Sequence, residues 1–207
     1  MTEGHGVRRQ PSKYDINLPR LDSRVLETNK RRIVAGRRQD GVELADRHRD
    51  LRIGDAYLVN DDSQVSLQRA VHTLAGYFKR EFRYDYNQYP VARDGFDPRE
   101  AWLWVADEYT NLRAVGAALF HQDRFKAPAG SERDWQMAWV LEFVWLHPYE
   151  RGQGLLSGSW EGWRARHPGF VVEQPWSPAM EGFLERHPHV YYDGKATSDI
   201  LARLRSR

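Results

Sequence analysis

The chain has 207 residues, of which 41% are hydrophobic and 13% aromatic, and a formal net charge of +2. This composition is typical of a folded protein and excludes an intrinsically disordered or strongly basic chain. The mean hydropathy of -0.76 argues against an integral membrane protein. The longest apolar run, residues 137–146, is interrupted by Glu142 and is shorter than the roughly 20 residues of a membrane-spanning helix. Without cysteine or an apolar leader, we expect a cytoplasmic protein with no membrane partner.

The first fifty residues carry most of the excess positive charge. They hold 12 Lys and Arg against 8 Asp and Glu. Paired arginines could contact phosphates of a nucleic acid, and they are Arg8-Arg9, Arg31-Arg32 and Arg37-Arg38. Acidic residues are interspersed with them, so we favour a solvated, partly disordered N-terminal extension over residues 1–50 and leave nucleic-acid binding as the alternative.

The first regular elements are expected after this segment. DAYLVN, residues 55–60, predicts a short strand. A helix capped by Ser63 or Ser66 should follow, because apolar residues recur there at helical spacing. These residues are Leu67, Val71, Leu74 and Phe78. Residues 101–109 and 114–122 then predict two strands joined by the short loop TNLR.

The strongest strand signal covers Trp135–Leu146. Its odd-numbered positions are all large and apolar, and its even-numbered positions are mostly apolar. Both faces of this strand should therefore be covered, as in a central strand. Glu142 is the exception, and strand alternation places it on the same face as Val144 and Leu146.

The remaining chain alternates helices and strands. Residues 155–166 predict a helix and residues 170–176 a strand, and Ser177-Pro178 is typical of a helix start. Residues 189–192 predict a last strand, before a short C-terminal helix or tail. We therefore expect one α/β domain over residues 51–207.

A glycine-spaced loop separates the central strand from the next helix. A helix N-terminus carries unpaired N–H groups and a positive dipole, and glycines let an anion approach the backbone. Arg151 would add a charged donor. The loop predicts a diphosphate site, although an ordinary tight turn would have the same glycines.

Residues 146–155, LHPYERGQGL, resemble motif A of the GNAT superfamily of acyl-CoA-dependent N-acetyltransferases. In that family the amides of a Gln/Arg-x-x-Gly-x-Gly/Ala segment hold the coenzyme A diphosphate. The matching segment here is Arg151, Gly152, Gln153, Gly154, Leu155 and Leu156. Leu156 stands where the family has Gly or Ala, and a larger side chain there would crowd the site. The likeness covers roughly residues 51–193.

The resemblance implies a mixed, mostly antiparallel sheet with helices on both faces and two central strands that splay apart. Acetyl-CoA would lie in the gap, with its pantetheine arm on the backbone of Val144 and Leu146. Glu142 would then lie near the thioester and act as general base, unless it serves only as an ion-pair partner. Tyr84, Tyr86 and Tyr89 follow the first helix, where the family often builds its acceptor site, and either clamp an amine or pin the loop.

One feature departs from the resemblance. The family often has a Tyr in the penultimate helix that protonates the leaving thiolate, and Leu184 occupies that position. Tyr191 or Tyr192 could substitute for it, but we favour strand packing or a surface position for both. His187 and His189 have no partners at the spacing of metal ligands, so we expect no metal site.

The sequence therefore predicts an N-acetyltransferase that moves an acetyl group from acetyl-CoA to a primary amine by direct attack in a ternary complex. The acceptor is a small molecule or a protein amine. Two alternatives stay open: a protein of this fold that binds a CoA ester without turnover, and one directed to nucleic acid by its basic N-terminal segment.

Overall fold

The protein is described by a computed structural model, which covers residues 14–39, 51–91, 98–108, 111–126, 135–173 and 175–187. The predicted strand at 189–192, the C-terminal helix, Tyr191, Tyr192 and His189 lie outside these residues, as do the first thirteen residues of the chain.

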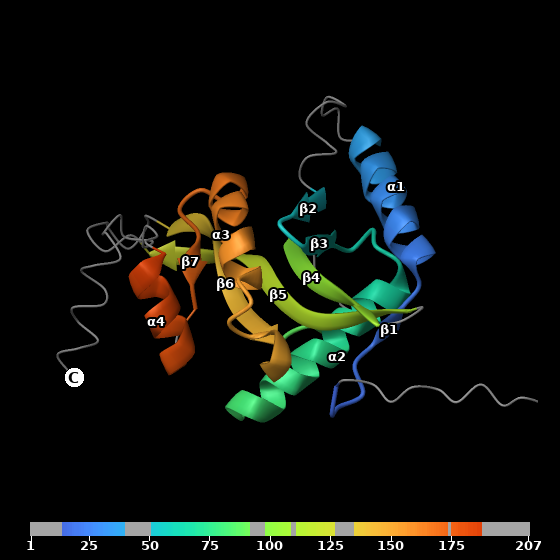
Figure 1. Cartoon of the computed structure of the whole chain (residues 1–207). Helices are drawn as coiled ribbons and strands as arrows, with labels where there is room; N and C mark the ends of the chain where they lie inside the picture. Colours follow the sequence, from blue (N-terminus) through green and yellow to red (C-terminus); the bar gives the residue numbers. More distant parts are fainter. Residues whose placement is uncertain are drawn as a thin grey trace, which may run out of the picture.

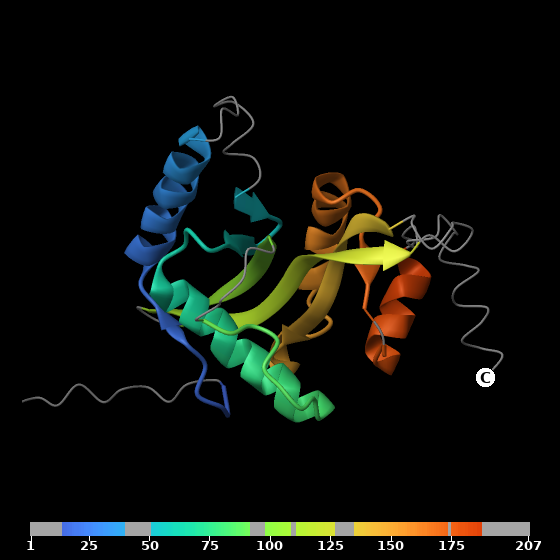
Figure 2. The same ribbon diagram turned by 180° about the vertical axis from the view of Figure 1, so that it is seen from behind.

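Seven strands form a single sheet (Figures 1 and 2). They are β1 (Arg20–Leu21), β2 (Arg52–Ile53), β3 (Ala56–Val59), β4 (Arg99–Glu108), β5 (Asn111–Lys126), β6 (Trp135–Leu146) and β7 (Val171–Val172). The order is β2-β3-β4-β5-β6-β7, with β1 paired to the end of β5. All pairs are antiparallel except β6 and β7, which run parallel. The mixed, mostly antiparallel sheet is confirmed.

Helices lie on both faces of the sheet, as expected (Figures 1 and 2). They are α1 (Ser23–Gln39), α2 (Val65–Phe82), α3 (Leu155–Arg166) and α4 (Pro178–Arg186). Phe78 of α2 packs on Phe143 of β6, with ring centroids 5.0 Å apart. Trp163 of α3 packs on the opposite face, where its ring lies 5.5 Å from that of Trp104 and 5.2 Å from that of Phe120.

The buried face of α2 and the start of α4 agree with the sequence, whereas the start of α2 does not. The apolar stripe of α2 is buried as predicted. Its N-cap, however, is Gln64, with no side-chain cap, so the predicted cap at Ser63 or Ser66 is wrong. Ser63 instead accepts a hydrogen bond from the amide of Asn60 and shapes the preceding turn. The Ser177 cap of α4 is confirmed, because its hydroxyl accepts from the amide of Met180 at 3.2 Å.

Residues 14–39 share the core of the residues that follow, although no regular element was expected there. Leu18, Leu21, Leu26 and Ile33 are each at most 5% exposed within that core. The side chain of Asn29 in α1 donates to the carbonyl of Leu58 in β3. The packing between these segments is therefore continuous.

A β-bulge interrupts β6 at Glu142. Leu119 of β5 pairs with Phe143, and Phe120 pairs with Leu141, so Glu142 is an extra residue without a partner. Because of this register shift, the prediction that Glu142 shares a face of the sheet with Val144 and Leu146 is wrong. His121, which contacts Glu142, lies with Leu119 on the face covered by α2, whereas Val144 pairs with Ala118 on the other face.

Strands β6 and β7 separate directly beside this bulge. Their pairing consists of Val140 with Val171 and Leu141 with Val172, and the amide of Glu173 makes a last hydrogen bond to the carbonyl of Leu141. Strand β6 continues to Leu146 without β7 beside it. The predicted splay of the two strands is confirmed.

Candidate active site

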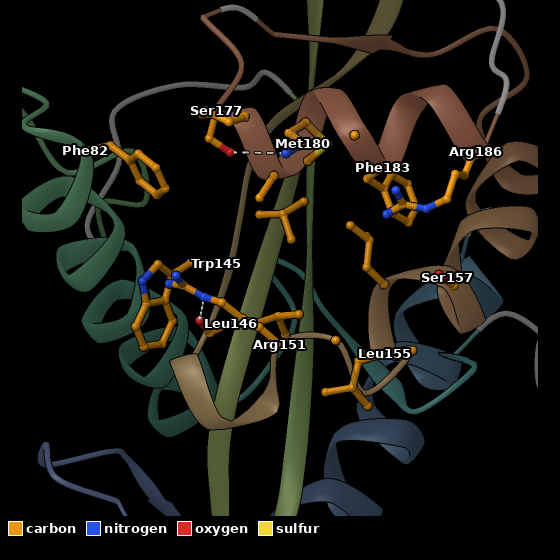
Figure 3. A pocket seen from close by; sticks show the side chains of 17 residues that line it. Phe82, Trp145, Leu146, Arg151, Leu155, Ser157, Ser177, Met180, Phe183 and Arg186 are labelled. Atoms are coloured by element: carbon orange, nitrogen blue, oxygen red, sulfur yellow. Dashed lines mark hydrogen bonds between the residues drawn. The ribbon is translucent and has the colours of Figure 1, made fainter.

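The gap opened by the splay is the site of the largest cavity that we describe. Its volume is about 540 Å³. Figure 3 shows that side chains from β6, the glycine loop, α3 and α4 surround it. The cavity therefore connects the segment that resembles motif A with the open edge of β6.

Beyond its last pairing with β7, strand β6 directs the backbone of Val144 and Leu146 toward the gap. The amide of His147 donates to Val115 in β5, so the backbone groups of Leu146 and Val144 point the other way. Both residues line the cavity. These are the two positions at which pantetheine contacts were expected. The carbonyl of Leu146, however, already accepts a hydrogen bond from Nε of Arg151 at 2.9 Å.

The glycine loop leaves a row of amides that have no backbone acceptor among the described residues. Gly152 and Gly154 have φ angles of +74° and +80°, which glycine adopts without strain. The amide of Gly158 is the first to donate within α3, to the carbonyl of Gly154 at 2.8 Å. The amides of residues 152–157 donate to no carbonyl of the described residues. A Cβ on either glycine would meet no atom of the described residues within 4 Å.

Arg151 lies at the cavity, but its guanidinium is engaged by the protein. Nη2 donates to Oε2 of Glu81 at 2.7 Å, and the same oxygen accepts from Nε1 of Trp145 at 2.8 Å. Burial opposes ionisation of Glu81, but the hydrogen bonds from Arg151 and Trp145 outweigh it and lower the pKa of this carboxyl. The expected free donor is thus half of an ion pair that joins α2 to the loop.

Arg186 supplies a second cation that the sequence did not single out. It lies in the last turn of α4 and lines the cavity opposite the glycine loop (Figure 3). The guanidinium makes no ion pair with a carboxylate of the described residues. Only the fold could place it there, because 31 residues of sequence separate it from Leu155.

The remaining predicted loop residues divide into two groups. Leu155 and Leu156 are half-buried, pack against the core and line the cavity. Leu156 therefore forms part of the apolar wall beside the open amides. Gln153 is exposed and does not line the cavity.

A narrow passage of about 60 Å³ continues from this cavity toward Glu142. Val144, Ser177 and Met180 line both spaces, so they are contiguous. The passage also reaches the Glu142 and Tyr84 side chains. The bulge thus brings a carboxylate to the inner end of the gap between β6 and β7.

Glu142 pairs with a histidine at that point. Its Oε2 lies 3.1 Å from Nδ1 of His121 in β5, and both side chains are partly buried. Burial opposes the charge on His121, but the hydrogen bond and negative charge of Glu142 outweigh burial, and the pKa of His121 is raised. The sequence singled out Glu142 but not His121, since the pairing depends on the β5–β6 register.

A second cavity, of about 420 Å³, lies beyond Glu142. Glu142 and Glu173 line both this cavity and the narrow passage. Three neighbouring spaces therefore follow one another from the glycine loop, past Glu142, to a polar chamber. Of the tyrosines expected at an acceptor site, Tyr86 lines this chamber and Tyr84 lines the passage, whereas Tyr89 is fully buried beneath Arg99.

Leu184 is fully buried in the core and does not line the cavities. A phenol at this position would be enclosed by protein. His187 stacks on Phe183 and contacts Ser157 through Nε2 at 3.1 Å. In the part of the chain that the structure describes, no group of three His, Asp or Glu side chains is arranged to hold a metal ion. Nor is any described helix both long and apolar enough to cross a bilayer.

No protein-family model and no curated protein sequence matches the chain. Among solved structures, a mutant of the BH1408 protein from Bacillus halodurans is similar at a TM-score of 0.45 and 11% identity, over 63% of this chain and 90% of that one. The xEco2 acetyltransferase domain is similar at a TM-score of 0.45 and 12% identity, over 66% and 87%. An acetyltransferase from Vibrio fischeri is similar at 0.34 and 9% identity, over 56% and 93%.

Proposed function

We propose that the protein is an N-acetyltransferase that binds acetyl-CoA in the gap between β6 and β7 and transfers the acetyl group to a primary amine. The observation that carries the proposal is the adjacency of two cavities, one beside the open amides of the glycine loop and one lined by Glu142, which share Val144, Ser177 and Met180. The likeness of residues 146–155 to motif A supports the same cofactor.

The glycine loop and Arg186 suit the diphosphate of coenzyme A. Amides 152–157 offer hydrogen-bond donors at the N-terminus of α3, where the helix dipole favours an anion. Arg186 adds a charge-assisted donor from the other wall. From there the pantetheine arm would follow the open backbone of Val144, which brings the thioester to the passage beside Glu142.

Glu142 is suited to accept the proton that an ammonium must lose before it attacks. The amine nitrogen then forms a bond to the thioester carbonyl carbon, the carbon–sulfur bond breaks, and the nitrogen releases a second proton, so that the products are an amide, a proton and the CoA thiolate. Glu142 is the unpaired bulge residue of β6, and it lines the passage. His121 holds the carboxylate in place from β5.

Tyr84 is the phenol placed to return a proton to the thiolate. It lines the narrow passage together with Glu142 and Ser177. Burial, with the negative charges of Glu173 and Glu142 nearby, raises the pKa of Tyr84, so the hydroxyl keeps its proton at neutral pH. Tyr84 would therefore take the role that Leu184 cannot fill.

The test is acetyl transfer by the purified chain. Acetyl-CoA is mixed with a panel of primary amines, thiol release is followed over time, and mass spectrometry identifies the acetylated product. We expect amine-dependent thiol release that is lost in Glu142→Gln. Binding of acetyl-CoA with no transfer to any amine would instead support a protein that binds CoA esters without turnover.

A further inference from the structure

Residues 14–19, which we call the N-terminal arm, precede β1 and are tied to two other elements of the fold. Two side chains donate hydrogen bonds to carbonyls of the arm: Tyr77 of α2 to Asn17 at 2.8 Å, and Arg113 of β5 to Leu18 at 3.1 Å. These contacts fix the course of the arm beside the sheet. The residues at its start therefore reach their partners from an anchored segment.

The start of the arm contacts the turn that leads from β6 into the glycine loop. This turn is a short 3₁₀ helix, Pro148–Glu150. The hydroxyl of Tyr14 donates to Oε1 of Glu150 at 2.7 Å, and Oδ1 of Asp15 lies 3.1 Å from Nε2 of His147. Two successive residues of the arm thus hold both ends of the turn that precedes the proposed diphosphate site.

The ring of His147 is at the centre of these contacts. It is fully buried, and its centroid lies 4.9 Å from that of the Tyr14 ring. Nδ1 accepts a hydrogen bond from the amide of Tyr149 at 3.3 Å, which caps the turn. Because Nδ1 is an acceptor, the proton of the neutral ring is on Nε2, which donates to Asp15. The amide of His147 also donates to Val115, so the sheet and the arm both hold this residue.

A loop with two glycines needs such support to bind an anion. Glycine has more backbone freedom than other residues, and Gly152 and Gly154 lie among the amides assigned to the diphosphate. Those amides have no backbone acceptor among the described residues, so backbone hydrogen bonds do not fix their directions. The loop is restrained at its ends, by the 3₁₀ turn before it and α3 after it. Holding a binding loop in its bound conformation raises affinity, because less freedom is lost on binding.

We propose that Tyr14 and Asp15 are positioning residues for the cofactor, which hold the 3₁₀ turn and through it direct the amides of the glycine loop. This inference rests on the proposed function and adds to it a role for the N-terminal arm. Neither residue is among those that line the cavity, so both act without touching CoA. Because coupling between two sites is reciprocal, CoA bound at the loop should also stabilise the docked arm.

The first test measures CoA affinity by calorimetry and acetyl transfer by steady-state kinetics. Tyr14→Phe and Asp15→Ala each remove one hydrogen bond, so each should weaken CoA binding and raise KM for acetyl-CoA by about two- to tenfold. The kcat at saturating acetyl-CoA should stay unchanged, because neither residue contacts the reacting groups. The side chain of Asp15 is 68% exposed, so its truncation leaves the core intact.

Two further variants separate the hydrogen bond from other effects. Asp15→Asn should bind CoA nearly as the wild type does, because an amide oxygen still accepts from Nε2 of His147. Glu161→Ala is the matched control for Asp15→Ala, since Glu161 is an exposed acid of α3 paired with Arg164, and it should leave CoA affinity unchanged.

Hydrogen–deuterium exchange measures the reciprocal effect. Saturating CoA should slow amide exchange in residues 14–19, and Asp15→Ala should reduce this protection. Equal CoA affinity in the wild type, Tyr14→Phe and Asp15→Ala would overturn the positioning role and leave the cofactor proposal standing, even if the melting temperatures of the variants fall. Failure of the wild-type chain to bind CoA would instead count against the proposed function, and the positioning role would fall with it.

Discussion

The Nδ1 atom of His121 lies 3.1 Å from Oε2 of Glu142, across the one register shift between β5 and β6. The shift makes Glu142 an unpaired bulge residue and turns it toward the α2 face. The strand pair β6–β7 ends at the adjacent residue, Leu141. A carboxylate, its histidine partner and an open strand edge are therefore brought together by a single irregularity of the sheet.

Replacing Glu142 by Gln should remove the base and keep the shape of the side chain. We expect kcat to fall by about 10²–10⁴-fold, the usual contribution of a general base. The affinity for CoA should change little, because the amides and cations assigned to the cofactor lie elsewhere. Kinetics with an accepted amine and calorimetry with CoA measure the two effects. Full activity of the variant would assign Glu142 a structural role only.

His121 should shape the pH dependence of the reaction. Against the effect of burial, the hydrogen bond and negative charge of Glu142 raise the pKa of His121 above the ordinary value of 6.5, and below this raised pKa the imidazolium competes with the substrate ammonium for Glu142. The rate should rise as pH passes through this pKa and frees the carboxylate. In His121→Asn that limb of the kcat/KM profile should disappear, which leaves the rise due to the amine itself. An unchanged profile would show that His121 does not act on Glu142 during catalysis.

Glu81 should weaken cofactor binding in the wild type. It holds the guanidinium of Arg151 at 2.7 Å and places a negative charge near the proposed diphosphate site. Glu81→Gln still accepts a hydrogen bond from Trp145 but loses the charge, so CoA affinity should rise by roughly two- to fivefold, as for a partly exposed ion pair. Glu161→Gln is the control and should have no effect. Weaker binding in Glu81→Gln would mean that the ion pair orients Arg151 for the cofactor.

Acid should destabilise the fold through Glu100, which links β4 to α3. Its two oxygens each accept from Arg166 at 2.6 Å, and Nε2 of His167 lies 3.0 Å away, a close charge contact. Burial opposes ionisation, but these contacts outweigh it and lower the pKa of Glu100 to about 2, from an ordinary value of 4.5. Because the folded pKa is depressed, this stabilisation is present above pH 4.5 and is lost as pH falls toward 2.

The loss over that window is on the order of 3 kcal/mol of unfolding free energy. Thermal unfolding monitored by circular dichroism between pH 2 and 6 measures it. In Glu100→Gln the melting temperature should be lower at pH 6 and should fall less steeply with acid. A parallel pH dependence in both proteins would show that other carboxyls control acid unfolding.

The sequence predicted the elements whose signals are local. The helical spacing of Leu67, Val71, Leu74 and Phe78, the apolar run of β6 and the Ser177-Pro178 cap each depend on a few neighbouring residues, and each is observed. The helix α1 was missed because most of its residues are polar or charged, and only a few, such as Leu26 and Ile33, reach the core.

The site was predictable only in part, because much of it depends on pairing between strands. The glycine loop is visible in the sequence, as its glycines are adjacent to the start of α3. The contact of His121 with Glu142 requires the β5–β6 register, and strand alternation alone put Glu142 on the wrong face. Arg186 and Gln88 line the cavities because of how their segments pack in the fold. The local sequence pattern around each residue does not predict that packing.

The most direct test of the account is calorimetric titration of the purified chain with CoA. We expect saturable binding with a Kd below about 1 mM, together with a rise in melting temperature. Arg186→Ala should weaken binding by about tenfold, as expected for loss of a charge-assisted hydrogen bond, while Arg164→Ala, an exposed arginine of α3 outside the cavity, should bind normally. Absence of both heat and thermal stabilisation at millimolar CoA, with a folded protein, would contradict the assignment of the gap between β6 and β7 as a cofactor site.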